Sequence, residues 1–290
     1  AVYLVATGTV ANSLALSLYA QPWSAVFAHT DAHIAQDECG APEFYTNGAK
    51  LIGVAGDHGR MTPETLGTAL ARTGTGGVHG VQRGVVSITN VTEAGTTYTP
   101  AEIAALTALA KSYNLPSHLD GARFANACVA TGAPAAEMTW QAGIDIVSFG
   151  GTKNGLPVGE AVVFFDRELS QDFAWRVKQA GQLASKMRFI SAPWVGLLDN
   201  DTWLHNARHA NAMAQRLYNG LLQVPGVQVL HAPQANGVFA QLPSPLIDAL
   251  HAKGWKFYQF IAGGGCRFMC AWDTSEASVD ALLHDMQALS

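Results

Sequence analysis

Short apolar runs alternate with helical patterns over the first two hundred residues of the chain. Strands are predicted at residues 2–6, 25–28, 51–55, 85–89, 117–120, 144–149 and 161–165. Helices are predicted between them, as at 9–19 and after Thr99, where Thr99 caps the first turn, Pro100 enters it and Glu102 faces the amide end. Strands that alternate with helices of ten or more residues favour a mostly parallel sheet with both faces covered. The fold class is therefore predicted to be α/β.

The pattern changes near Ser191-Ala192-Pro193. Helical spacing predicts one long helix over residues 194–222. After Pro225-Gly226 the elements are shorter, with strands predicted at 227–230, 238–242, 257–260 and 267–271 and helices near 246–252 and from Ser275. We therefore expect a large domain over residues 1–200 and a smaller α+β domain over residues 201–290. The chain begins directly in a strand pattern, so we expect a preceding segment to be missing from this sequence.

Composition excludes several classes of protein. The 290 residues are 49% hydrophobic and 13% charged, which suits a globular protein with a large core. A net charge of -5 without a run of lysine or arginine argues against nucleic acid and anionic membranes as partners, and no apolar run reaches 18 residues. The four cysteines form no Cys-x-x-Cys pair, so we expect free thiols in a reducing cytoplasm. No ligand cluster calls for a metal.

Candidate chemistry lies just after the predicted strands, where ligands of open parallel sheets bind. Thr7-Gly8-Thr9 opens a helix, and a helix N-terminus suits a phosphate, although a plain turn gives the same pattern. His33 follows the second strand. Asp120 ends a buried strand, where a carboxylate needs a positive partner; Arg123 and a protonated ring nitrogen of a cofactor are both candidates. Lys153 follows Gly150-Gly151, and a partly desolvated lysine suits a Schiff base, unless it is merely a surface lysine in a turn.

A phosphate site, a carboxylate for a ring nitrogen and a lysine that captures an aldehyde together describe pyridoxal 5'-phosphate. At these residues the chain resembles the low-specificity L-threonine aldolases, which have the aspartate aminotransferase fold, called fold type I. It is most similar to the bacterial branch that includes phenylserine aldolase. The matching motifs are Ala6-Thr7-Gly8-Thr9-Val10-Ala11-Asn12, Ala32-His33 followed by Glu38-Cys39-Gly40-Ala41, His118-Leu119-Asp120-Gly121-Ala122-Arg123 and Ser148-Phe149-Gly150-Gly151-Thr152-Lys153-Asn154-Gly155.

The resemblance implies a role for each matching residue. Lys153 would bind the cofactor as a Schiff base, Asp120 would keep its ring nitrogen protonated, and His33 would stack on the ring. Gly8 and Thr9 would hold the phosphate. The remaining implied residues are arginines: Arg123 and Arg267 for the substrate carboxylate, and Arg188 for a phosphate, which in this family can belong to the neighbouring subunit. A homodimer or homotetramer with shared sites is implied as well.

The implied reaction cleaves the bond between the α and β carbons of threonine, allo-threonine or phenylserine and yields glycine and an aldehyde. We expect His33, directly or through a water, to be the base, with Glu93 as second candidate. Two departures from the family concern this site. The usual N-terminal arm with its substrate-contacting serine is absent, and residues 90–95, Asn-Val-Thr-Glu-Ala-Gly, lack a histidine that many relatives carry there.

Other functions fit parts of the pattern. Another pyridoxal lyase of the same fold, catalysing β-elimination, or a racemase is the nearest alternative. A nucleotide-binding oxidoreductase is a second, although Gly8 is not part of a Gly-x-Gly-x-x-Gly turn. A non-catalytic protein with a cofactor-binding or structural role is a third. The sequence leaves the preferred side chain and the threo or erythro selectivity open.

Overall fold

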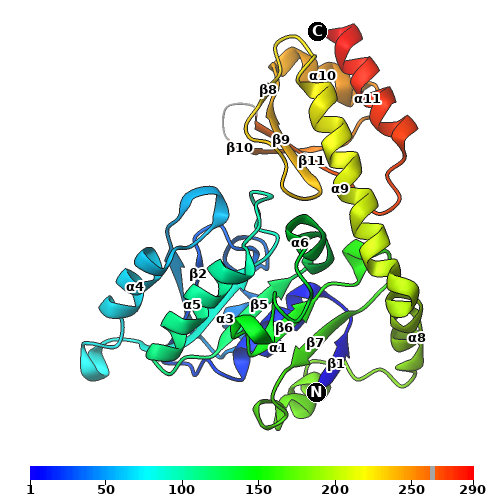
Figure 1. Cartoon of the computed structure of the whole chain (residues 1–290). Coiled ribbons are helices and arrows are strands. Elements are labelled where there is room, and N and C mark those ends of the chain that lie inside the picture. Colours follow the sequence, from blue (N-terminus) through cyan, green and yellow to red (C-terminus); the bar gives the residue numbers. More distant parts are fainter. Residues whose placement is uncertain (262–264) are drawn as a thin grey trace.

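The larger part of the molecule is built on a seven-stranded sheet (Figure 1). The computed structural model describes residues 1–261 and 265–290. The strand order is β1-β7-β6-β5-β4-β2-β3. Neighbours from β6 to β3 are parallel, whereas β7 is antiparallel to both β6 and β1, which confirms the mostly parallel sheet. The strands are β1 (Val2–Val5), β2 (Ser24–His29), β3 (Lys50–Val54), β4 (Gln82–Thr89), β5 (Ser117–Gly121), β6 (Ile146–Phe149) and β7 (Glu160–Phe164).

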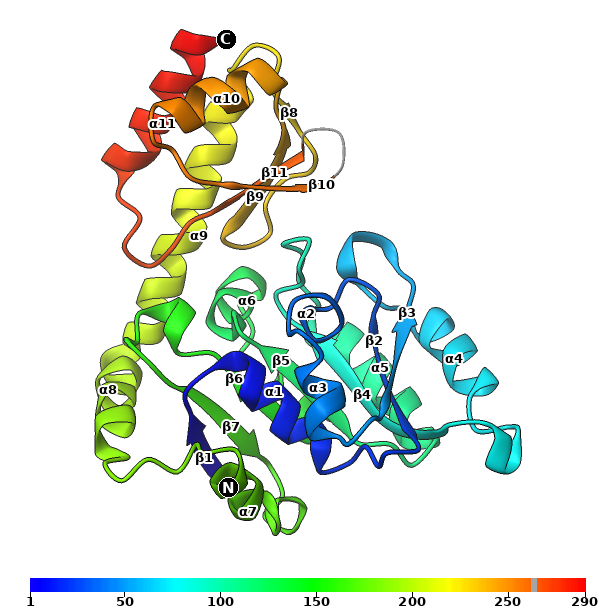
Figure 2. The same cartoon turned by 180° about the vertical axis from the view of Figure 1, so that it is seen from behind.

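Helices cover both faces of this sheet (Figure 2). On one face α4 (Pro63–Arg72), α5 (Pro100–Ser112) and α6 (Phe124–Thr131) share a core with β2, β4 and β5; it includes Phe27, Leu66, Ile88, Ile103, Leu106, Leu119 and Phe124. On the other face lie α1 (Gly8–Ser17), α3 (Ala41–Tyr45) and α7 (Phe173–Gln179), whose core includes Leu14, Ile146, Val162 and Phe173. The short α2 (His33–Gln36) follows β2. Burial on both faces explains why the strands are apolar runs.

Helix α5 begins where the sequence predicts it. The Thr99 hydroxyl accepts a hydrogen bond from the backbone N–H of Glu102 at 3.3 Å, and the Glu102 carboxylate accepts one from the backbone N–H of Thr99 at 2.7 Å. This reciprocal capping satisfies two amide groups that the first turn would otherwise leave unpaired. The buried residues Ile103, Leu106 and Ala110 confirm the predicted inner face.

The single helix predicted over residues 194–222 is wrong. Helix α8 (Arg188–Leu198) ends at a short 3-10 turn (Asp199–Asp201), and α9 (Thr202–Leu221) starts in a new direction. Asn200 and Asp201 have φ angles of 50° and 55°, in the left-handed region that asparagine and aspartate tolerate better than most residues. The predicted domain boundary between residues 200 and 201 lies in this turn, and the division into 1–200 and 201–290 stays a prediction.

Helix α9 leads to a second, smaller sheet with the order β10-β11-β9-β8 (Figure 1). All its neighbouring strands are antiparallel: β8 (Gln228–Val229), β9 (Gly237–Gln241), β10 (Tyr258–Ile261) and β11 (Gly265–Met269). Helices α9, α10 (Ser244–Ala252) and α11 (Glu276–Leu289) pack on it around a core that includes Leu217, Val238, Leu250, Phe268 and Met286. The smaller α+β part predicted from the sequence is therefore present.

No helix in the described ranges is both long and apolar enough to cross a membrane.

Replacing the buried Leu106 of α5 should destabilise the large core. We expect Leu106→Ala to lower the free energy of unfolding by roughly 2–5 kcal/mol, because it removes packed methyl groups and leaves a cavity. Urea denaturation measures the change. Leu183→Ala, at a side chain 52% exposed, is the matched control and should unfold close to the wild type. Equal midpoints for the two variants would contradict this view of the core.

Candidate active site

A cleft lies at the carboxyl ends of the central strands. Asp120 on β5 is in register with Thr89 on β4 and with Ser148 on β6, so the residues that follow these strands meet at one edge. Two cavities of about 300 and 470 Å³ open there. They share Gly8, Asn12, His33, Asp120, Ala122 and Lys153 as lining residues. The structure thus brings together four residues that the sequence singled out from separate motifs.

The glycine pair before Lys153 allows its loop to lie against the chain that follows β5. A Cβ on Gly150 would stand 2.4 Å from the Ala122 carbonyl oxygen, and one on Gly151 would stand 2.7 Å from the Trp194 ring, so only glycine fits at either position. The Glu160 carboxylate accepts hydrogen bonds from the Gly151 backbone N–H at 2.5 Å and from the Thr152 hydroxyl. These contacts place Lys153, in a 3-10 turn (Thr152–Asn154), at the cleft.

The environment of Lys153 makes its amine a better nucleophile. Burial disfavours the ammonium form, and the nearby Arg123 guanidinium adds like-charge repulsion, so the pKa of Lys153 is lowered from its ordinary value. A lower pKa leaves a larger fraction of the amine unprotonated near neutral pH. The side chain is therefore suited to attack a carbonyl group.

Asp120 is buried but is bound only by uncharged donors. The Asn12 side-chain amide donates to Oδ2 at 2.9 Å, and the Ala122 backbone N–H donates to Oδ1 at 3.0 Å. Among the described residues Asp120 forms no ion pair, so Arg123 does not serve as the positive partner that the sequence required. A buried carboxylate in this state attracts a cationic hydrogen-bond donor in the cleft.

A histidine bridge ties together the strands beneath the cleft. His118 on β5 is fully buried, with Nδ1 2.9 Å from the Ser87 hydroxyl on β4 and Nε2 2.9 Å from the Ser148 hydroxyl on β6. Burial lowers the pKa of His118 to about 4, so the ring is neutral. A neutral imidazole has one donor and one acceptor nitrogen, and the two hydroxyls can complement both.

His33 begins α2 and is oriented by a carboxylate. Its Nδ1 donates to Oε1 of the buried Glu38 at 2.8 Å, and the same oxygen accepts a hydrogen bond from the Asn12 amide at 3.0 Å. The hydrogen bond to Glu38 raises the pKa of His33. Asn12 and Glu38 lie in the motifs noted in the sequence, but no role was predicted for either. Asn12 lies one helical turn after Gly8, on the same side of α1, which is the signal that could have found it.

The N-terminus of α1 presents free amides to the cleft. The Thr7 hydroxyl caps the helix by accepting from the Val10 backbone N–H at 3.3 Å. Within the described chain, the backbone N–H groups of Gly8 and Thr9 have no hydrogen-bond partner, and a Cβ on Gly8 would meet no atom within 4 Å. Free amides, open space and the positive end of a helix dipole suit an anion, and the assignment of a phosphate to them stays a prediction.

Two arginines line the wider cavity from different parts of the molecule. Arg123 follows β5, whereas Arg267 comes from β11 of the small sheet and lies over the Tyr258 ring at 5.8 Å. Burial and the neighbouring Arg267 both lower the pKa of Arg123, and no ion pair to Arg123 occurs in the described residues. Two like charges at one cavity favour an anion between them, and a guanidinium fork suits a carboxylate.

Arg188 lies outside the cleft of its own chain. It starts α8, is exposed, and lies over the Phe189 ring at 5.2 Å; it lines neither cavity. Glu93, by contrast, lines the wider cavity, and its Oε1 accepts a hydrogen bond from the His33 backbone N–H at 2.7 Å. Across the described residues no group of three or more His, Cys, Asp or Glu side chains could hold a metal ion.

Replacing Glu38 should change the titration of His33. In Glu38→Gln the acceptor loses its charge while its size is kept, so the pKa of His33 should fall below its wild-type value. NMR titration of the histidine ring protons measures this shift. Glu64→Gln, at the exposed start of α4, should leave the His33 titration unchanged. An unshifted His33 in Glu38→Gln would show that Glu38 does not set its charge.

Comparisons with known proteins agree with the geometry of this site. The profile of the beta-eliminating lyase family matches residues 1–243. A low specificity L-threonine aldolase of Pseudomonas sp. (strain NCIMB 10558) is 50% identical over 289 residues, which is 99% of this chain and 83% of that protein. The protein of that name from Pseudomonas aeruginosa is 49% identical over 287 residues, covering 99% of this chain and 82% of the relative.

Solved structures show the same fold. The threonine aldolase of Leishmania major is 28% identical, with a TM-score of 0.91 over 100% of this chain and 84% of that one. The serine palmitoyltransferase of Sphingomonas wittichii, 15% identical with a TM-score of 0.71 over 99% of this chain and 71% of that one, shares the fold alone. The chain therefore belongs to the beta-eliminating lyase family and, within it, to the low-specificity L-threonine aldolases.

Proposed function

We propose that this protein cleaves the bond between the α and β carbons of threonine, allo-threonine and related β-hydroxy-α-amino acids such as phenylserine, yielding glycine and an aldehyde. Its family consists of enzymes that use pyridoxal 5'-phosphate. The observation that carries the proposal is the meeting of Lys153, Asp120 and a pair of arginines around one cleft.

The residues at the cleft fit this cofactor. The free amides of Gly8 and Thr9 suit its phosphate, and the Lys153 amine suits its aldehyde. Asp120, which holds only neutral donors, suits a protonated ring nitrogen. When bound, the cofactor supplies an electron sink for bonds broken at the α carbon.

The remaining residues orient the substrate. Arg123 and Arg267 would hold the α-carboxylate between them, which fixes the rotation about the α carbon and presents the bond to be broken. His33, held by Glu38, would keep its ring flat against the cofactor. Glycine and aldehyde as products distinguish this reaction from β-elimination, which yields a keto acid and ammonia.

We further propose a cytoplasmic homodimer or homotetramer in which Arg188 reaches the phosphate of the neighbouring subunit. Exposed apolar side chains near Arg188 support an interface on α8: Phe189, Val195 and Leu198 are all exposed. Apolar surface of this kind marks contacts between proteins. Free thiols at Cys39, Cys128 and Cys270 fit a reducing compartment.

Removing the Lys153 amine tests the central assignment. We expect Lys153→Ala to lose both the visible absorbance of the purified protein with added cofactor and aldehyde release from threonine, because no other amine lines the narrower cavity within the described chain. Spectroscopy and an aldehyde assay measure the two effects. Lys186→Ala, an exposed lysine outside the cleft, should behave as the wild type. Retained aldehyde release by Lys153→Ala would refute the assignment.

Mixing two inactive variants tests whether sites are shared. We expect Arg188→Ala to weaken cofactor binding, and mixed oligomers of Arg188→Ala with Lys153→Ala to recover part of the activity, since one site of each pair then has both residues intact. Aldehyde release after joint refolding is the measurement, and size-exclusion chromatography checks assembly. No recovery from properly assembled mixtures would show that Arg188 does not serve the neighbouring subunit's site.

A further inference from the structure

Glu93 is an acidic side chain on the wall of the wider cavity. It belongs to the loop between β4 and α5 and lines the wider cavity together with Lys153, Arg123 and Arg267. Lys153 is the residue proposed for the cofactor's aldehyde, and the two arginines are those proposed for the α-carboxylate of a substrate. The β-hydroxyl is attached one carbon further on, so a proton acceptor on another wall of this cavity is needed.

One oxygen of the Glu93 carboxylate is occupied and the other is not. Oε1 accepts the hydrogen bond from the His33 backbone N–H at 2.7 Å. Oε2 is buried and has no hydrogen-bond partner among the described residues. An unpaired buried carboxylate oxygen is costly unless a donor arrives, and a substrate hydroxyl in the cavity is such a donor.

The charges around Glu93 set its protonation near neutral pH. Four titratable groups interact electrostatically with the Glu93 carboxylate: Asp120 on β5, Arg123 after β5, His33 on α2 and Tyr98 on the same loop. The other titratable groups that line the same cavity are Asp37, Glu38, Lys153, Tyr258 and Arg267. Burial first, and Asp120 next, raise the pKa of Glu93 to about 7. A base whose pKa lies near the operating pH is effective because it is both available and sufficiently basic.

His33 is the less suitable base. The hydrogen bond from its Nδ1 to Glu38 favours the protonated ring and raises the pKa of His33. The same hydrogen bond occupies Nδ1, so this side of the ring is not open to a substrate hydroxyl. With the cofactor bound, the ring would also pack against it, whereas Oε2 of Glu93 has no hydrogen-bond partner among the described residues.

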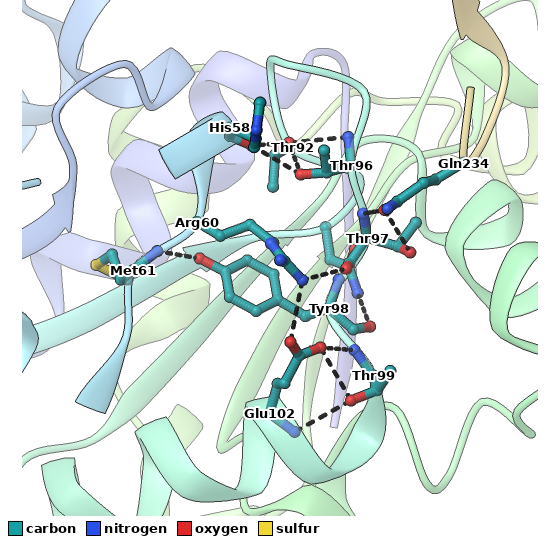
Figure 3. Close-up of polar contacts among 11 residues, drawn as sticks. His58, Arg60, Met61, Thr92, Thr96, Thr97, Tyr98, Thr99, Glu102 and Gln234 are labelled. Atoms are coloured by element: carbon teal, nitrogen blue, oxygen red, sulfur yellow. Dashed lines mark hydrogen bonds and ion pairs between the residues drawn. The ribbon is translucent and has the colours of Figure 1, made fainter. Parts of the chain in front are cut away.

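The loop that carries Glu93 is fixed from two sides (Figure 3). The Thr96 hydroxyl donates to the His58 carbonyl oxygen at 2.7 Å and lies 2.8 Å from the Thr92 hydroxyl, which stands 3.3 Å from the same carbonyl oxygen. On the far side the Gln234 side-chain oxygen accepts a hydrogen bond from the Thr97 backbone N–H at 2.7 Å. Gln234 precedes β9, so the small sheet region helps to hold the loop. Such support is what a positioned acid or base requires.

We propose that Glu93, rather than His33, takes the β-hydroxyl proton of the substrate, an inference that rests on the function proposed above. As the O–H bond breaks, the proton passes to Oε2 and a carbonyl double bond forms at the β carbon. The bond between the α and β carbons breaks with its electron pair left at the α carbon, which then takes a proton to become glycine. Glu93 returns its proton to water when the aldehyde has left.

The variant Glu93→Gln separates this step from the rest of the reaction. It keeps the size of the side chain and removes the base, so cleavage of threonine should fall about 100-fold or more. Exchange of the glycine α-proton with deuterated water involves no hydroxyl group and should persist, as should glycine binding measured by calorimetry. In the wild type, kcat should rise with pH through about 7 as Glu93 ionises, and this rise should vanish in Glu93→Gln.

Further measurements keep the inference falsifiable. Glu43→Gln, which alters a glutamate with a similarly unpaired buried oxygen but outside both cavities, should leave cleavage unchanged. If Glu93→Gln does not fold, Glu93→Asp decides, because it should keep partial cleavage and a pH-dependent rise. A carbon-13 carboxyl NMR titration of the wild type without amino acid should show a glutamate that titrates near 7.

Three results would overturn the assignment. In the first, Glu93→Gln cleaves threonine within a few fold of the wild type and its pH profile is unchanged. In the second, Glu93→Gln loses glycine exchange and glycine binding together with cleavage. In the third, every glutamate in the wild-type NMR spectrum titrates at its ordinary pH. A wild-type enzyme that releases no glycine and aldehyde from threonine would instead refute the proposed function itself.

Discussion

The cleft is organised around a buried carboxylate, Asp120, that forms no ion pair among the described residues. Asp120 holds two neutral donors, and the elements around it are arranged to keep it in this state. Helix α1 contributes Asn12 from one end of the cleft and the free amides of Gly8 and Thr9 from the same turn. Since a buried charge without an ionic partner is unfavourable, the folded chain carries a cost that a bound cationic ring would relieve. Cofactor binding should therefore also stabilise the protein.

The cleft is completed by parts of the chain far apart in sequence. Gly95, in the loop of Glu93, has a φ of 76°, and a Cβ there would stand 2.7 Å from the Phe239 ring on β9. Arg267 reaches the same cavity from β11. The large sheet region thus carries the groups proposed for the cofactor, whereas the small sheet region contributes Arg267 and supports the loop of Glu93. The lining of the wider cavity therefore depends on how the two sheet regions meet.

Sequence reasoning found the strand-end residues because a parallel sheet makes them neighbours whatever the loops do. Lys153, Asp120, His33 and Gly8 could be placed together for this reason alone. It predicted no role for Glu38, because the path of the chain after α2 decides which side chain meets His33. The long helix over 194–222 failed because apolar periodicity continues across Asn200, whose left-handed backbone leaves little trace in the pattern. Arg188 lies outside its own cleft. Any role at a neighbouring site would depend on contacts between chains, and periodicity within one chain does not encode such contacts.

The hydrogen bonds of His118 to Ser87 and Ser148 make the stability of the central strands sensitive to low pH. Because His118 stays neutral down to about pH 4 in the folded protein, whereas an unfolded chain would protonate it near its ordinary value of 6.5, acidification favours unfolding across that interval. The penalty amounts to something on the order of 3 kcal/mol once the lower limit is passed. The same imidazole aligns β5 and β6, the strands that end beside Asp120 and Lys153. Acid sufficient to charge this ring would loosen the spacing of the reactive groups as well as the fold.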